Sequence, residues 1–284
     1  MPYIETAEQF SLFYTDYPGD EPVVFAHAWG LNGDMWSYQL PELMTAGFRC
    51  VTYDRRGHGH SDRPPTGYDI DTLADDLAAV IERLDLSNIT LIGHSMGTAE
   101  VIRYLTRHGS GRIARLVLSG TVTPMLLQSA DNPDGIPADV AAQSRAAMLR
   151  DIGDWMNMSG KAEYFSGEHR VSQQLLDWTL NTIAAVPLPV LTQTSDAFLR
   201  ADFRSELTEL TIPTLVIHGT ADTSMPIDLT ARNTARLIPH CRFITIDGAG
   251  HGLYLSDSRR YNAALLEFIA SAQVPVTAST PNSS

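Results

Sequence analysis

The stretch ITLIGHSMGT, residues 89–98, decides the fold. Its first four residues form a short apolar run, which predicts a buried strand. GHSMG, residues 93–97, follows and matches the pattern G-x-S-x-G, and the apolar spacing after it predicts a helix. A five-residue match arises by chance, but a match placed between a strand and a helix is the setting that a nucleophilic serine on a sharp turn requires.

Ser95 is therefore the candidate nucleophile. Side chains two residues away on either side would collide with the neighbouring strand and helix, and Gly93 and Gly97 avoid this collision. The turn places the hydroxyl at the N-terminus of a helix, where partial positive charge favours a developing oxyanion. The alternative, a plain serine in a strand-to-helix turn, is disfavoured by this context.

Further short apolar runs predict strands that are buried on both faces, as the central strands of a parallel sheet are. They cover residues 23–26, 48–53, 116–118, 214–217 and 243–246. Apolar residues with a period of 3.6 predict helices over residues 71–84 and 261–269. This alternation indicates an α/β protein with a mostly parallel sheet, whose functional loops lie at the carboxyl ends of the strands.

Residues 121–206 break the alternation, because they contain no convincing strand and show helical spacing. We interpret them as a helical cap inserted over the carboxyl edge of the sheet. Either the cap is a set of ordinary packed helices, or it also shapes a substrate pocket. The predicted domains are a core formed by residues 1–120 and 207–271, the cap, and a flexible tail over residues 272–284, which are rich in Ser, Thr and Pro.

A serine nucleophile needs a base, and the base needs an orienting acid. His251 lies in a glycine-rich loop after the last predicted strand, and Asp222 follows the strand at residues 214–217. The other acids are less apt: Asp196 and Asp202 lie in or near the cap, and Asp247 is too close to His251 in sequence. The expected chain order is thus nucleophile, acid, base. A turn histidine and an N-cap aspartate without chemistry are the alternatives.

Two backbone amides are needed to hold the oxyanion. We expect one from Met96, the residue after the nucleophile. We expect the other from Trp29, in the loop after the predicted strand at residues 23–26. Because these are main-chain roles, the side chains do not diagnose them. Trp29 can also serve as a hydrophobic plug or line the acyl pocket.

Composition excludes several classes of protein. The 284 residues carry 20 Lys and Arg against 33 Asp and Glu, a net charge of −13, which argues against binding to nucleic acid or to anionic membranes. No apolar stretch reaches 18 residues, and the first residues lack the features of a signal peptide, so we expect a cytoplasmic protein. Cys50 and Cys241 sit in apolar runs and are expected to be reduced core residues.

With these motifs in place, the sequence resembles the α/β-hydrolase family, and more narrowly the bacterial serine esterases grouped with cofactor-free haloperoxidases, or perhydrolases. The matching segments cover most of the chain outside the cap, at residues 27–36, 53–62, 93–97, 213–226 and 248–252. The resemblance implies the α/β-hydrolase fold, with the cap inserted after the sixth strand of the family's usual numbering. It also implies a triad of Ser95, Asp222 and His251, with Trp29 and Met96 as oxyanion donors.

Three positions depart from the family pattern. Ala28 and Thr98 stand where the family usually has glycine, and Gly30 stands where haloperoxidase-like members often have proline. Gly30 lacks the fixed φ that proline would impose beside an oxyanion donor, which weakens the case for perhydrolysis. None of the three departures removes a catalytic group.

The expected activity is hydrolysis of a small or medium, largely apolar carboxylic ester or lactone through an acyl-enzyme, without a metal or cofactor. The apolar residues expected to line the pocket are Trp29, Met125, Trp155, Met158, Trp178 and Phe198. Alternatives on the same triad are a C–C bond hydrolase, an amidase and a perhydrolase, and outside enzymes a ligand sensor with slow turnover. The expected partner is a small-molecule substrate, with no nucleic acid or membrane, and assembly into a homo-oligomer stays open.

Overall fold

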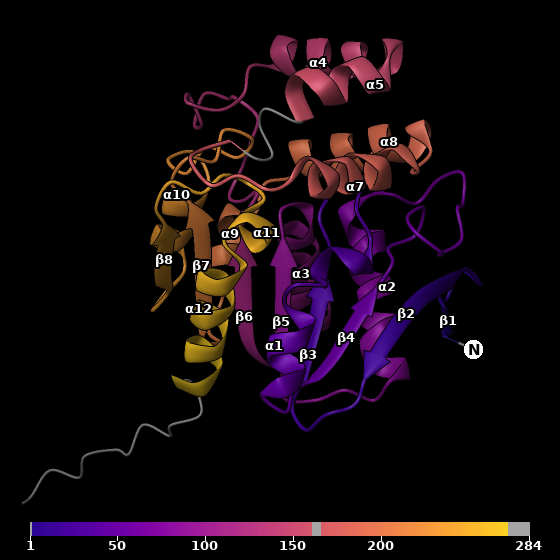
Figure 1. Ribbon diagram of the computed structural model, residues 1–284, viewed down its shortest axis with the longest axis vertical. Helices are drawn as coiled ribbons and strands as arrows, with labels where there is room; N and C mark the ends of the chain where they lie inside the picture. The colour runs from indigo at the N-terminus through magenta and orange to yellow at the C-terminus, as the bar shows by residue number, and fades with distance from the viewer. Residues whose placement is uncertain (1, 161–165, 272–284) are drawn as a thin grey trace, which may run out of the picture.

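The computed structural model describes residues 2–160 and 166–271. Eight strands form one sheet in the order β1-β2-β4-β3-β5-β6-β7-β8 (Figure 1). The parallel strands are β4 (Arg49–Tyr53), β3 (Pro22–Ala26), β5 (Ile89–His94), β6 (Ile113–Ser119), β7 (Thr214–Gly219) and β8 (Arg242–Ile246). The sequence prediction of a mostly parallel sheet is confirmed.

Two antiparallel strands extend the sheet at one edge, and the apolar pattern missed both of them. They are β1 (Tyr3–Glu5) and β2 (Ser11–Tyr17), which pairs with β4. In β2 only Leu12 is buried, and the other residues are exposed or half-buried. An edge strand of this kind lacks the continuous apolar run that marks the central strands.

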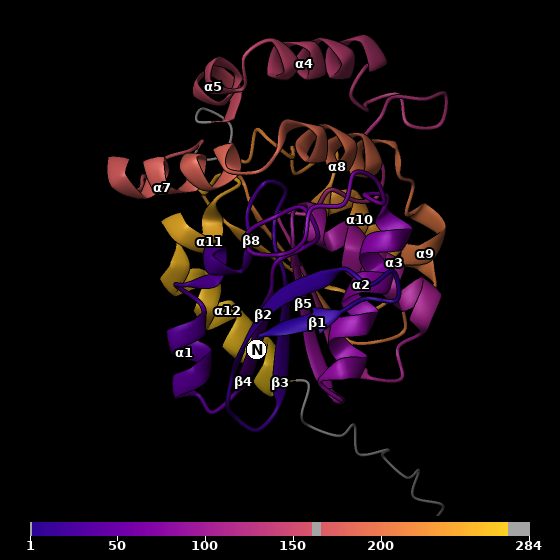
Figure 2. The same cartoon turned by 90° about the vertical axis from the view of Figure 1, so that its right-hand side faces the viewer.

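Helices cover both faces of the sheet because alternate residues of each central strand point to opposite sides. Val24 and Ala26 of β3 join one core with the helices α2 (Ile70–Arg83) and α3 (Met96–His108). Val23 and Phe25 join the other core with α1 (Leu40–Thr45) and α12 (Ser258–Ser271). Figure 2 shows these two groups of helices on opposite sides of the sheet.

Shorter helices connect the remaining parts of the core. They are the 3₁₀ turn η1 (Gly33–Trp36) after β3, α9 (Arg204–Thr208) and α10 (Ala231–Leu237) around β7, and α11 (Leu253–Ser256). Every loop between a parallel strand and the helix that follows it lies at the carboxyl edge of the sheet. This edge is where the fold collects side chains from segments far apart in sequence.

A layer of helices lies over this edge (Figures 1 and 2). It contains α4 (Ala138–Arg150), α5 (Ile152–Trp155), the π turn η2 (Met156–Gly160), α7 (Gln173–Ala184) and α8 (Leu188–Arg200). As expected, no strand occurs between residues 121 and 206 among those that are described, apart from isolated bridges. The tail predicted over residues 272–284 lies outside the described residues.

The two cysteines and the longest apolar helices can be compared with the sequence predictions. Cys50 is buried and Cys241 half-buried, and neither forms a disulfide. In the described part of the chain no single helix is long and apolar enough to span a membrane; α7 and α8 reach that length only as a sharply bent pair.

Candidate active site

Ser95 occupies the tight turn between β5 and α3. Its φ of 55° and ψ of −123° lie in a strained region that a serine rarely adopts. A Cβ at Gly97 would lie 2.3 Å from the carbonyl oxygen of Ala26 in β3, and a Cβ at Gly93 would lie 2.5 Å from that of Gly97. Only glycine fits at these two positions, as the sequence indicated, and the turn presents Ser95 at the carboxyl edge of the sheet.

Hydrogen bonds on both sides hold this strained backbone. The amide of Ser95 donates to the carbonyl of Ser119 in β6 at 2.9 Å. The hydroxyl of Thr98 donates to the carbonyl of Ser95 at 2.6 Å and accepts the amide of Val122 at 3.2 Å. Thr98 therefore links the turn to the segment that leaves β6, a connection that the glycine usual at this position in the family could not make.

The acid and base candidates meet after β7 and β8. Nδ1 of His251 lies 2.7 Å from Oδ2 of Asp222, and both side chains are almost completely buried. The loops that carry them are themselves joined, because the amide of Ala221 donates to the carbonyl of Ala249 at 2.9 Å. Two residues 29 positions apart thus form a buried, directly bonded pair.

A second histidine contacts the same carboxylate. Nε2 of His218 lies 3.1 Å from Oδ2 of Asp222 and 2.8 Å from the carbonyl of Met225, whose amide in turn donates to Oδ1 of Asp222. Burial by itself would raise the pKa of Asp222. Electrostatic interaction with His251 and the hydrogen bonds from both histidines outweigh this effect and hold the pKa well below its ordinary value. Asp222 is therefore ionised, as an acid that stabilises an imidazolium must be.

His94 lies between the candidate nucleophile and the candidate base. It precedes Ser95, its Nδ1 lies 2.9 Å from the hydroxyl of Ser119, and its ring packs on that of His251 with centroids 4.9 Å apart. Burial, followed by repulsion from His251, lowers the pKa of His94 well below its ordinary value. A neutral His94 packs against the ring of His251 without placing a charge beside it. The imidazole of His251 therefore lies beside the turn that carries Ser95.

The expected oxyanion donors are the amides of Trp29 and Met96. Within the described residues neither amide donates to a protein acceptor. Nδ1 of His27 lies 2.8 Å from the carbonyl oxygen of Ala28, and Nε2 of His27 accepts the amide of Arg55 at 2.9 Å. The proton is therefore on Nδ1, which donates to Ala28. Because this carbonyl and the amide of Trp29 belong to one planar peptide group, the hydrogen bond sets the direction of that amide.

Beneath this loop lies a fully buried charged network. The guanidinium of Arg55 donates to Glu100 and, at 2.9 Å, to the carbonyl of His27, and Tyr53 donates to the other oxygen of Glu100. Burial, together with the nearby charge of Arg55, lowers the pKa of His27 and keeps its ring neutral. No sequence pattern identifies Arg55 as the partner of His27, or Glu100 as the partner of Arg55, because the two residues of each pair lie 28 and 45 positions apart.

Gly30 has a φ of 69°, a value that the ring of proline, fixed near −65°, cannot adopt. The loop after β3 therefore has a backbone conformation that differs from one built around proline at this position. This observation gives a physical basis to the departure from the haloperoxidase pattern noted above.

The six expected pocket residues lie in different surroundings. The ring of Trp29 contacts that of Trp155 with centroids 5.7 Å apart, and its Nε1 donates to the carbonyl of Leu191 in α8. Phe198 is buried in the core cluster on the α2 and α3 side of the sheet, and Met125 packs half-buried against that cluster. Met158, in contrast, is 70% exposed.

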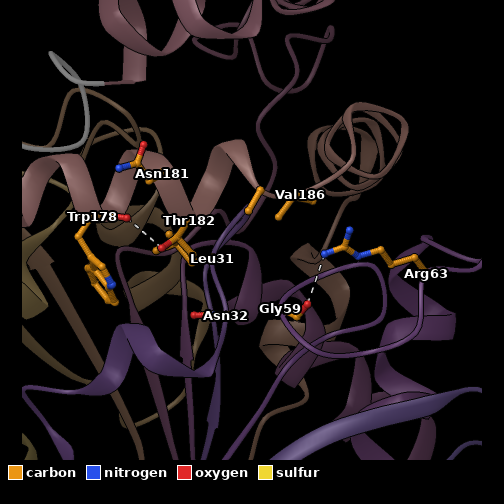
Figure 3. Close-up of a pocket in the computed structure, with 9 residues that line it drawn as sticks. Leu31, Asn32, Gly59, Arg63, Trp178, Asn181, Thr182 and Val186 are labelled. Carbon is orange, nitrogen blue, oxygen red and sulfur yellow. Dashed lines mark hydrogen bonds between the residues drawn. The ribbon is translucent and has the colours of Figure 1, made fainter.

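The sixth expected residue, Trp178 of α7, lines a hollow of about 320 Å³. Leu31 and Asn32 from the loop after β3, and Gly59 and Arg63 from the loop after β4, form its other side (Figure 3). None of the residues that line this hollow is Ser95, Asp222 or His251, so we assign it no catalytic role. No group of three or more metal-type ligands occurs among the described residues.

Comparison with known proteins places these features in a family. A family model described as "alpha/beta hydrolase fold" matches residues 21–258. The chain is 38% identical to the non-heme chloroperoxidase CPO-A1 of Kitasatospora aureofaciens, over 95% of this chain and 99% of that protein. It is 31% identical to the bifunctional esterase/perhydrolase DCH of Acinetobacter calcoaceticus, over 95% of this chain and all of that protein. An esterase from Exiguobacterium antarcticum, 29% identical, superposes with a TM-score of 0.90 and covers 94% of this chain and 98% of its own.

Proposed function

Because the chain belongs to the α/β-hydrolase family, we propose that it is a serine hydrolase that cleaves a small or medium, largely apolar carboxylic ester or lactone. One observation carries the proposal: the ionised Asp222 is bonded to His251 beside the strained turn that presents Ser95. That arrangement of residue types activates a serine hydroxyl for attack on an acyl carbon. The esterase names of several relatives support the same class of substrate.

The proposed reaction has two halves. His251 accepts the proton of Ser95 as its oxygen attacks the carbonyl carbon, and Asp222 stabilises the imidazolium that forms. The amides of Trp29 and Met96 hold the oxyanion, His251 then protonates the departing alkoxide, and an acyl-enzyme remains. In the second half His251 deprotonates water, which attacks the acyl group and releases the acid.

The preference for an apolar, neutral substrate rests on the surroundings of the site. Trp29 carries an oxyanion amide, and its side chain contacts Trp155 of the cap, so the acyl group of a bound ester would lie near aromatic surface. The net charge of −13 does not attract anionic substrates from a distance.

Perhydrolysis is a second candidate because one relative is named a bifunctional esterase/perhydrolase. In that reaction hydrogen peroxide replaces water in the second half, attacks the acyl group and releases a peracid. Gly30 has a φ that proline cannot adopt, so the loop differs from that of haloperoxidase-like members with proline at this position. This difference favours hydrolysis as the main activity.

Turnover of p-nitrophenyl acetate and p-nitrophenyl butyrate tests the proposal. We expect rapid multiple turnover by the wild-type protein and loss of turnover in Ser95→Ala, with unchanged circular dichroism. Most of the activity surviving in Ser95→Ala, with contaminating esterase excluded, would refute the assignment. A single acylation without recycling would instead favour a ligand sensor, and peracid formed from acetate ester and hydrogen peroxide would favour the perhydrolase.

A further inference from the structure

A serine from the cap contacts the chain on both sides of Asp222. The hydroxyl of Ser166 donates to the carbonyl of Ala221 at 2.7 Å and accepts the amide of Thr223 at a longer 3.4 Å. These two groups belong to the residues that flank the acid. Ser166 is half-buried and precedes α7 by seven residues, so it comes from a segment that carries none of the expected catalytic groups.

The same segment also contacts the loop that carries His251. The amide of Glu168 donates to the carbonyl of Gly248 at 2.9 Å. A Cβ at Gly250 would lie 2.2 Å from the carbonyl oxygen of Ser166, so the backbones are in close contact one residue before His251. Residues 166–168 therefore lie across the acid loop and the base loop together.

A contact between two polar side chains follows at the end of this segment. Nδ1 of His169 lies 2.5 Å from Oδ1 of Asp257, a buried carboxylate just after α11. This contact adds a third attachment between the cap segment and the part of the core that carries the base. The segment thus contacts the acid loop through residue 166, the base loop through residue 168, and the residue after α11 through residue 169.

We propose that Ser166 is a positioning residue for the Asp222–His251 pair, and that it makes the geometry of this pair depend on the cap. The inference rests on the proposed serine hydrolase function. A carboxylate orients an imidazole only while its own backbone is held, and Ser166 holds the peptide groups before and after Asp222. The role of Ser166 is therefore to act through Asp222, by way of these two peptide groups.

Ser166→Ala tests this role when kcat is expressed per active site titrated by the p-nitrophenol burst. We expect kcat to fall roughly 3- to 10-fold, the effect that one hydrogen bond supports, with KM unchanged. Titration separates positioning from folding, because misfolded protein lowers the number of active sites but not the rate at each one. Ser129→Ala is the matched control: this half-buried cap serine bonds Asp131 within its own turn. It should retain the wild-type kcat.

A double-mutant cycle with Asp222→Asn completes the test. If Ser166 acts through Asp222, Ser166→Ala should have no further effect on the rate of fluorophosphonate labelling in the Asp222→Asn background. An unchanged kcat in Ser166→Ala would overturn the inference while leaving the serine hydrolase assignment in place. So would an equal loss of labelling rate on Ser166→Ala in the wild-type and Asp222→Asn backgrounds. Ester turnover unaffected by Ser95→Ala would instead refute the proposed function itself.

Discussion

At the scale of single residues, the site depends on conformations and charges that are unfavourable in isolation. Ser95 keeps a strained backbone that costs about 1–3 kcal/mol. Asp222 is ionised although it is buried. Hydrogen bonds from Thr98 to Ser95, and from His218 and Met225 to Asp222, compensate for these costs. The groups around these two residues therefore help to keep Ser95 in its strained conformation and Asp222 ionised.

Asp222→Asn should reduce kcat by about 10⁴-fold, because an amide neither stabilises the imidazolium nor fixes the correct tautomer of His251. The measurement is steady-state hydrolysis of p-nitrophenyl acetate by the purified variant. Asp196→Asn removes a carboxylate that pairs with Arg145 at the surface, and it should keep kcat within about twofold of wild type. A near-normal rate in Asp222→Asn would mean that another acid serves His251.

At the scale of elements, the turn between β5 and α3 is joined to the segment after β6 through Thr98. Thr98→Gly should lower the free energy of unfolding by about 2 kcal/mol, from the entropy of glycine in a helix and from a lost hydrogen bond. Urea unfolding measures this change. Thr98→Ser keeps the hydroxyl and should lose less than half as much. Equal stability of Thr98→Gly and wild type would contradict the role given to this hydroxyl.

The strands that could be predicted from sequence are those with apolar residues at nearly every position, such as β5 and β7. Edge strand β2 could not be recognised in this way, because residues such as Asp16 face solvent and interrupt the pattern. Helical spacing in the cap was visible, but it does not say which face is buried. Met158 was expected in the pocket, but its side chain is largely exposed. The sequence around it could not show this, because it does not reveal which residues pack against a side chain.

At the scale of the whole molecule, the loops at the carboxyl edge bring together residues whose partners no local pattern reveals. The glycine motif around Ser95, the glycine-rich loop of His251 and the place of Asp222 after a predicted strand were sufficient to identify the three residues as candidates. The contacts of Ser166 with the acid loop and of Arg55 with His27 have no sequence signature, because each joins segments that meet only after folding. Geometry of this kind depends on the complete fold.

Buried histidines also make the stability of the molecule depend on pH. Burial lowers the pKa of His58 to about 3, so between that value and about 6.5 the unfolded chain binds a proton that the folded chain does not. Burial lowers the pKa of His27 and His94 in the same direction. Asp76 opposes them, because burial raises its pKa to about 6 and the folded state then binds the extra proton. Burial also raises the pKa of Asp54, which acts in the same direction as Asp76. With three histidines against two carboxyl groups, stability should fall as the pH drops below about 6.5.

His58→Asn isolates one of these groups. Unfolding by urea at several pH values between 5.0 and 6.0 should give a slope that is smaller than the wild-type slope by about 1.4 kcal/mol per pH unit. The comparison of slopes is independent of any constant loss of stability in the variant. Identical slopes would show that His58 is not held neutral in the folded protein.

The covalent reaction of a fluorophosphonate with the wild-type protein tests the central claim most directly, because it reports an activated serine without assuming a substrate. We predict one phosphonyl group per chain, located by mass spectrometry of proteolytic peptides on Ser95, with labelling slowed strongly in Asp222→Asn and absent in Ser95→Ala. Labelling of a different residue, or no labelling of a preparation that turns over esters, would contradict the account.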